Sequence, residues 1–196
     1  MSVESQFRYL RLIAEAYNLA PSLIICSGAA YGDNNYEDIF PNSKIVYVDM
    51  KSGDGINYTW NLEEEPPQNL VGACDLFICT SVLEHVKRPW LASKNITKTI
   101  KRNGLLFLTV PWAWEYHGFP GDYWRMSPEA LDILFEDSKL GHQFWVTHPD
   151  GKGYKSLEQI PCLTDKYFVG DCPDGDKYKI RTHPLIQVFQ VRQINS

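Results

Sequence analysis

The fold of this chain is decided by Asp75-Leu76-Phe77-Ile78-Cys79-Thr80-Ser81-Val82-Leu83-Glu84-His85-Val86. The first half of this stretch is apolar and predicts a buried strand over residues 74–80, whereas the second half carries polar side chains. Lys87-Arg88-Pro89-Trp90 follows and leads into a helical pattern. Open α/β sheets place their ligand sites where a strand ends just before a helix. We therefore expect an α/β fold with a ligand site after residue 80.

Apolar runs and helical spacings alternate along the rest of the chain. They predict helices over 5–18, 36–40, 88–102 and 128–137, and strands over 23–26, 44–48, 56–60, 74–80, 105–110, 144–147 and 185–191. Asn103-Gly104 is expected to cap a helix, Pro111 to stop a strand, and Ser127 to cap the helix that follows it. This alternation predicts a mostly parallel sheet with helices on both faces and an antiparallel C-terminal hairpin at one edge.

Length and composition describe an ordinary globular chain. Of its 196 residues, 44% are hydrophobic and 22% are charged. That length favours one domain, 1–196, around a single core. Within this domain we expect an N-terminal helix in 1–20, the core of the fold in 22–137, and a long loop or insertion at 149–182.

Charge and hydropathy exclude some classes of partner. The net charge of −5 argues against a general nucleic-acid-binding surface, which needs clusters of Lys and Arg. No run of residues approaches the roughly 18 consecutive apolar positions of a membrane helix. Residues 1–5 lack the basic and apolar segments of a signal peptide, so we expect a cytoplasmic protein. Neither nucleic acid nor membrane is expected as a partner, and the oligomeric state is not readable from the sequence.

The cysteines predict neither a disulfide framework nor a metal site. The five cysteines form no C-x-x-C pair, and their odd number favours free thiols. Cys162, Cys172, His148 and His183 match no zinc-binding spacing. We therefore expect no bound metal.

The segment after the strand at 74–80 carries a family resemblance. Ser81-Val82-Leu83-Glu84-His85-Val86, followed by Pro89-Trp90, resembles the S-x-L-E-H-x-x-x-P-W segment of class I S-adenosylmethionine-dependent methyltransferases of the type 11-like kind. The resemblance implies a Rossmann-like methyltransferase sheet and S-adenosylmethionine as cofactor. It covers residues 22–137, which makes that part of the chain a cofactor-binding core.

The family binds its cofactor at the ends of the first strands, and the turn after the first strand departs from its pattern. The family has E/D-x-G-x-G there; this chain keeps Gly28, with Ile24 or Ile25 at the acidic position and Cys26 at the first glycine. An ordinary strand-to-loop turn is the alternative, and Asp33 and Asn34 are candidates for a substitute contact. By resemblance the cofactor would contact residues that follow these strands, namely Ser27, Gly28, Ala29, Asp49, Met50, Asn61, Leu62, Ser81 and Glu84.

Two of these positions have a specific expected role and a structural alternative. Asp49 ends the second strand, where a carboxylate accepts hydrogen bonds from both ribose hydroxyls; it could instead form a turn with Lys51. Asn61 could donate to and accept from the adenine edge, or make local backbone bonds in its loop.

A second segment predicts the acceptor side of the site. Residues 111–131 resemble a bacterial and phage subgroup with the pattern P-x-x-x-x-x-H-G-x-P-x-D-Y-W-R-x-[ST]-P-E-A-L. The resemblance implies an aromatic wall for the acceptor, with substrate contacts from Trp112, Tyr116, Asp122, Tyr123 and Arg125. Alternatively, Asp122 and Arg125 pair with each other and fix the segment while the aromatic side chains pack over the sheet edge.

The resemblance favours methyl transfer to a small-molecule or glycan-like acceptor, at oxygen. The sulfonium methyl is already electrophilic, so the protein must align the acceptor and provide modest help from a general base. His117 is the first candidate for that base and His85 the second. The altered turn motivates an alternative from another class, a catalytically inactive binding or scaffold domain. A nicotinamide-dependent dehydrogenase fits less well, because no G-x-G-x-x-G follows the first strand.

Overall fold

A computed structural model describes residues 3–28, 36–118, 120–148, 153–154 and 185–195. The helices, with η marking single 3₁₀ turns, are α1 (Val3–Ala16), η2 (Tyr36–Asp38), η3 (Gln68–Leu70), η4 (Leu83–His85), α2 (Pro89–Thr99) and α3 (Pro128–Leu134). The strands are β1 (Leu23–Ser27), β2 (Lys44–Asp49), β3 (Tyr58–Thr59), β4 (Cys74–Thr80), β5 (Ile100–Ala113), β6 (Ser138–His148), β7 (Gly153–Tyr154) and β8 (Leu185–Ile194).

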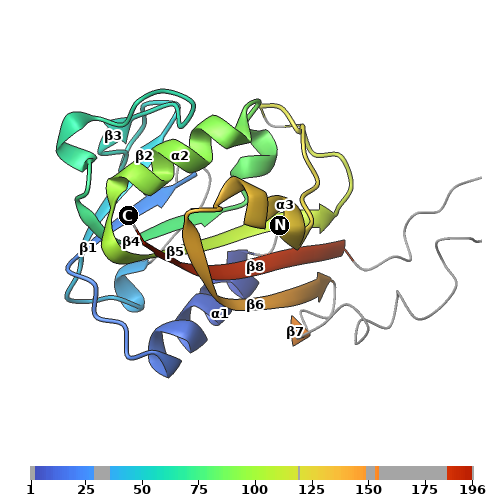
Figure 1. The fold of residues 1–196 in the computed structure, drawn as a ribbon, viewed down its shortest axis with the longest axis horizontal. Coiled ribbons are helices and arrows are strands. Elements are labelled where there is room, and N and C mark those ends of the chain that lie inside the picture. The colour runs from blue at the N-terminus through green and yellow to red at the C-terminus, as the bar shows by residue number, and fades with distance from the viewer. Residues whose placement is uncertain (1–2, 29–35, 119, 149–152, 155–184, 196) are drawn as a thin grey trace, which may run out of the picture.

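All of these strands form one sheet in the order β3-β2-β1-β4-β5-β8-β6-β7. The five strands from β3 to β5 run parallel, and β8 is antiparallel to both β5 and β6 (Figure 1). The predicted mostly parallel sheet with an antiparallel C-terminal pair is thereby confirmed. β8 does not lie at the edge, because it inserts between β5 and β6.

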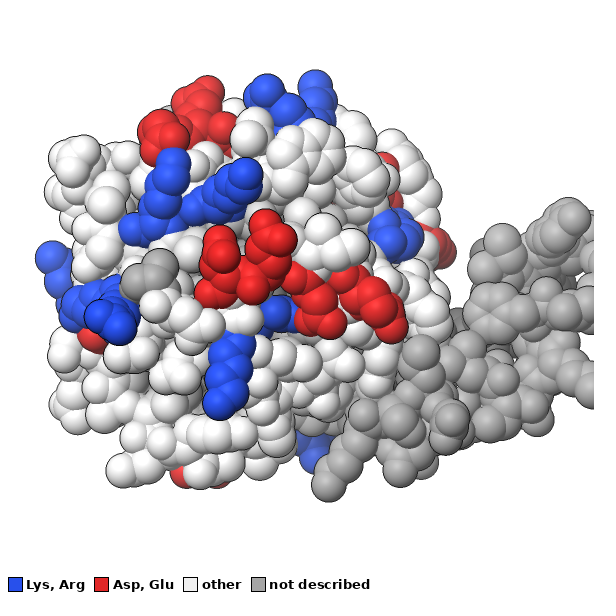
Figure 2. Space-filling model, viewed as in Figure 1, with Lys and Arg blue, Asp and Glu red and all other residues white. Residues whose placement is uncertain are grey.

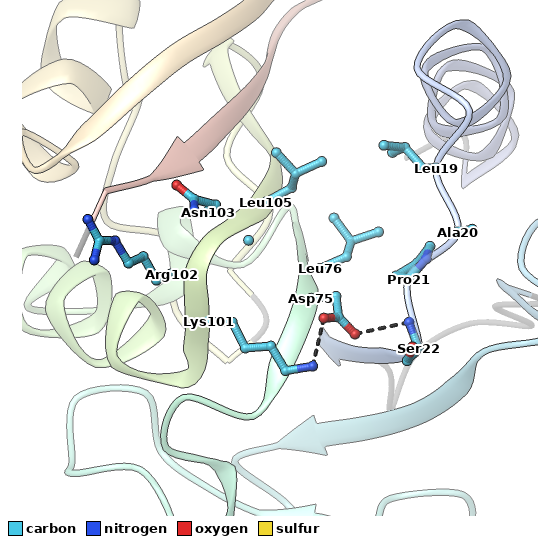
Figure 3. A pocket seen from close by; sticks show the side chains of 11 residues that line it. Leu19, Ala20, Pro21, Ser22, Asp75, Leu76, Lys101, Arg102, Asn103 and Leu105 are labelled. Carbon is cyan, nitrogen blue, oxygen red and sulfur yellow. Dashed lines mark hydrogen bonds and ion pairs between the residues drawn. The ribbon is translucent and has the colours of Figure 1, made fainter.

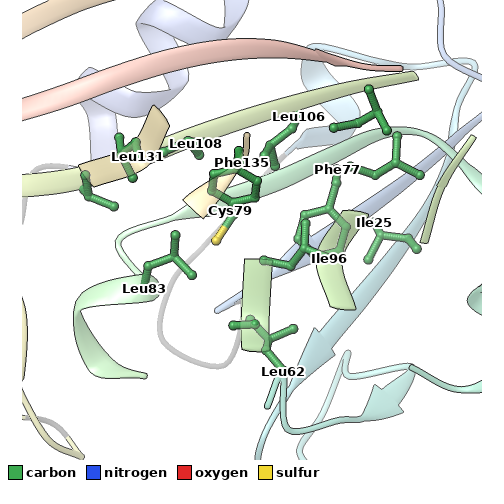
Figure 4. Packing of buried hydrophobic residues seen from close by; sticks show 14 of the residues in the cluster. Ile25, Leu62, Phe77, Cys79, Leu83, Ile96, Leu106, Leu108, Leu131 and Phe135 are labelled. Atoms are coloured by element: carbon green, nitrogen blue, oxygen red, sulfur yellow. The ribbon is translucent and has the colours of Figure 1, made fainter. Parts of the chain in front are cut away.

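Alternating side chains of the central strands divide the core into two layers. Ile25, Phe77 and Leu106 face the layer that holds α2 and α3, where Figure 4 shows them packed against side chains of those helices. Their neighbours Ile24 and Ile78 face the opposite layer, which holds α1. Because both faces of the parallel strands are covered, these strands read as continuous apolar runs in the sequence. The helices thus lie on both faces of the sheet, as predicted (Figure 1).

The expected boundary between α2 and β5 was wrong. α2 ends at Thr99, and Ile100, which is 4% exposed, already pairs with Cys74 of β4. Residues 101–104 then interrupt the pairing register before it resumes at Leu105. Asn103 has a positive φ of +64°, but it belongs to this irregularity inside β5 and does not cap a helix.

Pro111 does not stop β5, which continues to Ala113 and pairs Pro111 with Gln187 of β8. The last pair between β4 and β5 is Thr80 with Thr109, so Pro111 has a strand neighbour on one side only. A position of this kind tolerates the missing N–H of proline, as an edge strand does. At α3 the expected cap is confirmed: Ser127 Oγ accepts a hydrogen bond from the Ala130 N–H at 3.3 Å. The helix ends at Leu134, before the expected residue 137, because β6 begins at Ser138.

Charges of both signs lie on the face that carries α2 and α3. Figure 2 shows acidic side chains gathered near the middle of that face, with basic side chains in separate groups around them. Among the described residues no helix is long and apolar enough to cross a bilayer.

Candidate active site

A pocket of about 720 Å³ opens at the carboxyl ends of the parallel strands. Its walls come from the ends of β1 and β2, the loop after β3, and the residues that follow β4. The lining residues are Gln6, Ser27, Gly28, Val48, Asp49, Met50, Lys51, Trp60, Asn61, Leu62, Glu63, Thr80, Ser81, Val82, His85, Val86, Lys87, Arg88, Pro120 and Tyr123. The structure therefore brings most of the predicted cofactor residues together around one cavity.

Gly28 is the residue at which β1 turns into the pocket. Its φ is +79°, a conformation that side-chain-bearing residues rarely adopt, and a Cβ there would lie 2.6 Å from Cγ2 of Val82. Ile24 or Ile25 stands where the family has its acid, and Cys26 where it has its first glycine; all three are buried in the two core layers. The β1 turn therefore presents backbone and Ser27 to the pocket, without a carboxylate. Ala29 and the loop residues Asp33 and Asn34 lie outside the described residues.

Asp49 ends β2 at the pocket wall, and its side chain also makes a local turn. Its Oδ1 accepts a hydrogen bond from the backbone N–H of Lys51 at 3.0 Å. The residue is 8% exposed and lines the cavity. The turn-forming and pocket-facing roles raised from the sequence are thus compatible. Met50 follows at the rim with 55% of its surface exposed.

Hydrogen bonds from α2 fix the loop after β3. Nδ2 of the buried Asn95 donates hydrogen bonds to the carbonyl oxygens of Leu62 at 2.9 Å and Glu64 at 2.8 Å. Within the loop, Oδ1 of Asn61 accepts the backbone N–H of Glu63 at 3.1 Å. This is the local bond that the sequence offered as an alternative, and it leaves the Asn61 amide at the pocket wall. Leu62 lines the pocket, yet it is only 6% exposed and belongs mainly to the core.

Ser81 follows β4 in a left-handed conformation, with a φ of +54°. Its Oγ accepts hydrogen bonds from Nε2 of Gln6 and Nε2 of Gln187, both at 2.9 Å. Such a backbone costs roughly 1–2 kcal/mol for a residue with a side chain. These bonds from α1 and β8 hold Ser81 in place beneath the cavity. The contribution of Gln6 was not predicted, because α1 lies outside the segment of family resemblance.

Asp122 and Arg125 fix the segment between β5 and α3. The guanidinium of Arg125 donates to both oxygens of Asp122, at 2.5 and 2.6 Å, which holds the pKa of that carboxyl well below its ordinary value. The remaining N–H groups of Arg125 donate to the carbonyl oxygens of Trp114, Glu115 and Trp124. All five guanidinium N–H donors are thus used inside the segment. Arg125 and Asp122 therefore fix the segment, which is one of the two compatible roles expected for them, and neither lines the pocket.

The same segment is tied to η4. The backbone N–H of Tyr123 donates to the carbonyl oxygen of Glu84 at 2.8 Å, and Nε1 of Trp124 donates to that of Val86 at 2.8 Å. Tyr123 faces the pocket and is 48% exposed. Trp112 instead packs against Trp145, with ring centroids 5.6 Å apart. Of the predicted acceptor wall, only Tyr123 borders the cavity, while Tyr116 is 78% exposed and lies outside its lining.

Glu84, His85 and His117 come together beside this pocket. Their nearest ligand-type atoms all lie within 4.8 Å of one another, and the two imidazole rings meet edge to face at 5.0 Å. Glu84 is fully buried, and burial raises the pKa of its carboxyl to about 8. Burial also lowers the pKa of His85, which lines the pocket. The two candidate bases are therefore neighbours, although 32 positions separate them in the sequence (117 − 85).

A second pocket, of about 300 Å³, lies at the amino ends of the strands. Figure 3 shows Asp75 between Lys101 and Ser22 at its centre. The Asp75 carboxylate accepts the Ser22 N–H at 2.9 Å and the Lys101 ammonium at 2.7 Å. These bonds anchor the start of β1 to β4 and β5, which is a structural role.

The overall fold matches those of solved methyltransferases. The N-methyltransferase NodS from Bradyrhizobium japonicum WM9, in complex with S-adenosylhomocysteine, superposes with a TM-score of 0.60 over 98% of this chain and 88% of its own, at 13% identity. The 1,6-didemethyltoxoflavin-N1-methyltransferase from Burkholderia thailandensis, solved with that compound and S-adenosylhomocysteine, gives 0.62 over 96% and 78%, at 11% identity. The chain has the class I methyltransferase fold. The expected fold is thereby confirmed.

The methyltransferase fold also carries other chemistry. The [4+2]-cyclase SpnF matches with a TM-score of 0.62 over 95% of this chain and 80% of its own, at 13% identity. No protein-family model matches the chain, and no curated protein does. The fold alone therefore does not determine the chemistry of the site.

Proposed function

We propose that this protein transfers a methyl group from S-adenosylmethionine to an oxygen atom of a small-molecule or glycan-like acceptor. The observation that carries the proposal is the pocket at the carboxyl ends of β1, β2 and β4, which gathers Gly28, Asp49 and Ser81 on its wall. The structural neighbours NodS and the toxoflavin methyltransferase hold S-adenosylhomocysteine, the product of such a transfer.

In this proposal the cofactor lies across the strand ends. The backbone at Ser27 and Gly28 approaches the methionine portion, since Gly28 turns the chain at the pocket wall with a positive φ and carries no side chain. The Asp49 carboxylate accepts hydrogen bonds from the ribose hydroxyls, and Asn61 and Leu62 flank the adenine. Ser81, held by Gln6 and Gln187, supports the floor below the methyl group. Met50 and Glu84 complete the cofactor surroundings at the rim and behind the floor.

The acceptor enters from the side of η4 and Tyr123. Tyr123 offers an aromatic face at the pocket edge, suited to a sugar or a planar ring. His117, or His85 beside it, accepts the proton of the acceptor hydroxyl as the methyl group is transferred. An adjacent imidazole pair favours a hydroxyl acceptor, since a hydroxyl must lose a proton. The two neighbours named as N-methyltransferases act on nitrogen, so the choice of atom is specific to this proposal.

One observation favours a different function, that of an inactive binding or scaffold domain. The β1 turn has the buried Ile24 or Ile25 where the family places an acid, and the buried Cys26 where it places a glycine. Without that acid, one cofactor contact is missing, and the pocket would serve only as a surface for another molecule.

Isothermal calorimetry with S-adenosylmethionine and S-adenosylhomocysteine separates the two functions. A methyltransferase should bind both compounds with micromolar dissociation constants, which correspond to a standard binding free energy of about −8 kcal/mol. No heat of binding at millimolar cofactor would instead support the scaffold. Transfer of a radiolabelled methyl group to a panel of hydroxylated sugars and phenols then tests the acceptor class, with reactions lacking the protein as the control for background labelling.

A further inference from the structure

The cluster of Glu84, His85 and His117 has the features of an empty metal site. Glu84 and His85 come from η4, and His117 comes from the segment after β5. One ligand-type atom from each residue lies within 4.8 Å of the other two. Glu84 is fully buried, whereas the side chains of His85 and His117 are 18% and 28% exposed. The cluster is thus shielded from solvent at Glu84 and partly exposed to solvent at His85 and His117.

Backbone carbonyls fix which nitrogen of each imidazole is available. Nδ1 of His85 contacts the carbonyl oxygen of Gly121, and Nδ1 of His117 lies 3.0 Å from that of Glu115. A carbonyl oxygen only accepts, so both Nδ1 atoms must carry the proton. The Nε2 atom of each neutral ring then presents a lone pair. Metal-binding histidines have this arrangement, in which the second ring nitrogen donates to a carbonyl and orients the ring.

Three ligand atoms of this cluster also lack partners. Among the described residues, neither carboxylate oxygen of Glu84 has a hydrogen-bond partner. The buried Nε2 of His117 has none among them either. The Nε2 atom of His85 lies 3.9 Å from Oε1 of Glu84, which is too far for a hydrogen bond. A buried carboxylate without partners is costly, and a bound cation removes that cost.

We propose that Glu84, His85 and His117 bind one divalent transition-metal ion, of which zinc fits best. Two imidazole nitrogens and one carboxylate are a typical ligand set of catalytic zinc sites, which keep the fourth position open. Magnesium and calcium are disfavoured because they prefer all-oxygen ligands. Zinc at 2.0–2.1 Å from each ligand needs ligand atoms about 3.3 Å apart, so side-chain rotations that bring the three atoms closer by up to roughly 1.5 Å would close the site. This proposal differs from the expectation of no metal that was drawn from the cysteine and histidine spacings.

The open position faces the cavity, because His85 also lines the pocket. An oxygen of water or of an acceptor hydroxyl could occupy it. A metal ion and a general base would use the same Nε2 lone pairs, so a metal-loaded molecule would activate a hydroxyl through the ion. Metal binding itself requires only the three ligands, whether or not the protein transfers methyl groups.

The test uses full-length protein in which Cys162 and Cys172 are replaced by serine, so that these thiols cannot supply ligands. After dialysis against a chelator, the protein is titrated with Zn²⁺ by calorimetry and with Co²⁺ by visible absorption. We expect one equivalent of each metal to bind, with absorption bands typical of four-coordinate cobalt. His117→Ala and Glu84→Gln should each weaken zinc binding at least about 100-fold. His142→Ala, which alters a histidine outside the cluster, should leave it unchanged.

A thermal melt gives a second readout that does not need catalysis. Zinc should raise the melting temperature of the parent protein and of His142→Ala, but not that of His117→Ala. No binding by the parent, or equal affinity in the parent and both cluster variants, would overturn the proposal. S-adenosylmethionine titrations of the metal-free protein are run in parallel. A protein that binds cofactor without binding zinc refutes the metal site alone, and one that binds zinc without cofactor refutes only the proposed methyl transfer.

Discussion

The carboxylate of Asp122 and the guanidinium of Arg125 form a bidentate pair that also sets the position of a candidate catalytic histidine. The two N···O distances are 2.5 and 2.6 Å, and one oxygen of Asp122 also accepts the backbone N–H of His117 at 2.9 Å. The Asp122 side chain is 1% exposed and that of Arg125 is 26% exposed. The pair is therefore the internal support of the segment between β5 and α3.

Replacing Asp122 by Asn should lower the free energy of unfolding by about 3 kcal/mol, because the partly buried guanidinium of Arg125 loses a charged partner that is itself buried. Urea denaturation followed by circular dichroism measures this. Glu65→Gln is the matched control, since the pair between Glu65 and Lys98 has side chains 77% and 44% exposed. It should cost less than about 1 kcal/mol. Equal effects of the two variants would contradict the structural role of Asp122.

The Asp122 effect should also depend on pH. The pKa of this carboxyl lies below its ordinary value because of the hydrogen bonds from Arg125. Its contribution to stability is therefore fully present above the unfolded pKa of about 3.9 and is lost as the pH falls further. In metal-free protein, the difference between the parent and Asp122→Asn should shrink when denaturation is repeated below pH 4.

Gly28→Ala should destabilise the fold and weaken cofactor binding. The variant carries a backbone cost of about 1–2 kcal/mol at a φ of +79°, and its new Cβ lies 2.6 Å from Val82. Gly55→Ala is a matched control, because Gly55 has the same φ with nothing within 4 Å. The difference between the two unfolding free energies isolates the Val82 contact. Adding Val82→Ala to Gly28→Ala should recover that difference; no recovery would show that the contact is unimportant.

Asp49→Asn should reduce the affinity for S-adenosylmethionine by about 10–100-fold, since hydrogen bonds to a charged acceptor contribute roughly 1.5–3 kcal/mol. The amide keeps an oxygen for the Lys51 N–H, so stability should change little. Calorimetry gives the affinity. Asp54→Asn removes the same charge from an exposed position in the following loop and should bind cofactor as the parent does. An unaltered affinity in Asp49→Asn would exclude the ribose contact.

Asn95→Ala should loosen the loop after β3. The carbonyl oxygens of Leu62 and Glu64 each lose a donor, at a cost of about 2 kcal/mol for the two bonds together. Because this loop forms the wall near Asn61, cofactor affinity should fall as well. Asn69→Ala, at an exposed position, is the control and should affect neither quantity strongly. An Asn95→Ala variant with unchanged stability and unchanged cofactor affinity would show that the loop after β3 keeps its conformation without the bonds from Asn95.

The thiols of Cys26, Cys74 and Cys79 should be unreactive in the folded protein. All three are buried, and burial raises the pKa of Cys74 and Cys79 to about 12, so at pH 8 the thiol form prevails. In the background without Cys162 and Cys172, alkylation should be at least about 100-fold slower in buffer than in urea. Mass spectrometry counts the labelled thiols. Rapid labelling of the folded protein would contradict the packing of these strands.

The parts of the fold that the sequence predicted well are those with one strong local signal. β4 was predicted with its observed bounds, because residues 74–80 are apolar on both faces and polar residues follow directly. Gly28 was identified as the retained glycine of the family's turn, and its positive φ explains why a glycine stands there. Ser127 was identified because a helix cap requires a particular type of residue. The alternation of elements was enough for the sheet class, since parallel strands need crossover helices.

The errors arose where tertiary contacts decided between local options. Lys101-Arg102-Asn103 suits a helix end, yet pairing of Ile100 with Cys74 draws the chain into the sheet one turn earlier. For Arg125 the sequence left open both an acceptor contact and a pair with Asp122; the structure shows that pair, together with bonds to three backbone carbonyls. Residue spacing in the sequence does not determine which hydrogen-bond partners a side chain meets on distant segments.

The cluster beside the pocket shows the same limit. Both His85 and His117 were singled out as separate candidates, and Glu84 as a cofactor contact. That they meet depends on the hydrogen bonds from the backbone N–H groups of Tyr123 and Trp124 to the carbonyl oxygen of Glu84, which bring the segment after β5 onto η4. A search for spaced Cys and His residues could not find this set, because its third member comes from a distant segment and one ligand is a glutamate.

The way Arg125 fastens its segment has a consequence for changing what the protein accepts. Its bonds run to main-chain oxygens and to one interior carboxylate, so the frame does not depend on the outward side chains at 116, 120 and 123. Those positions could be substituted in evolution, or randomised in a library, without loss of the hydrogen bonds that Arg125 makes to the segment. Residues of this loop that could select a bound compound are thus distinct from those that stabilise its conformation. The loop is therefore a suitable place to introduce substitutions that change which compound binds.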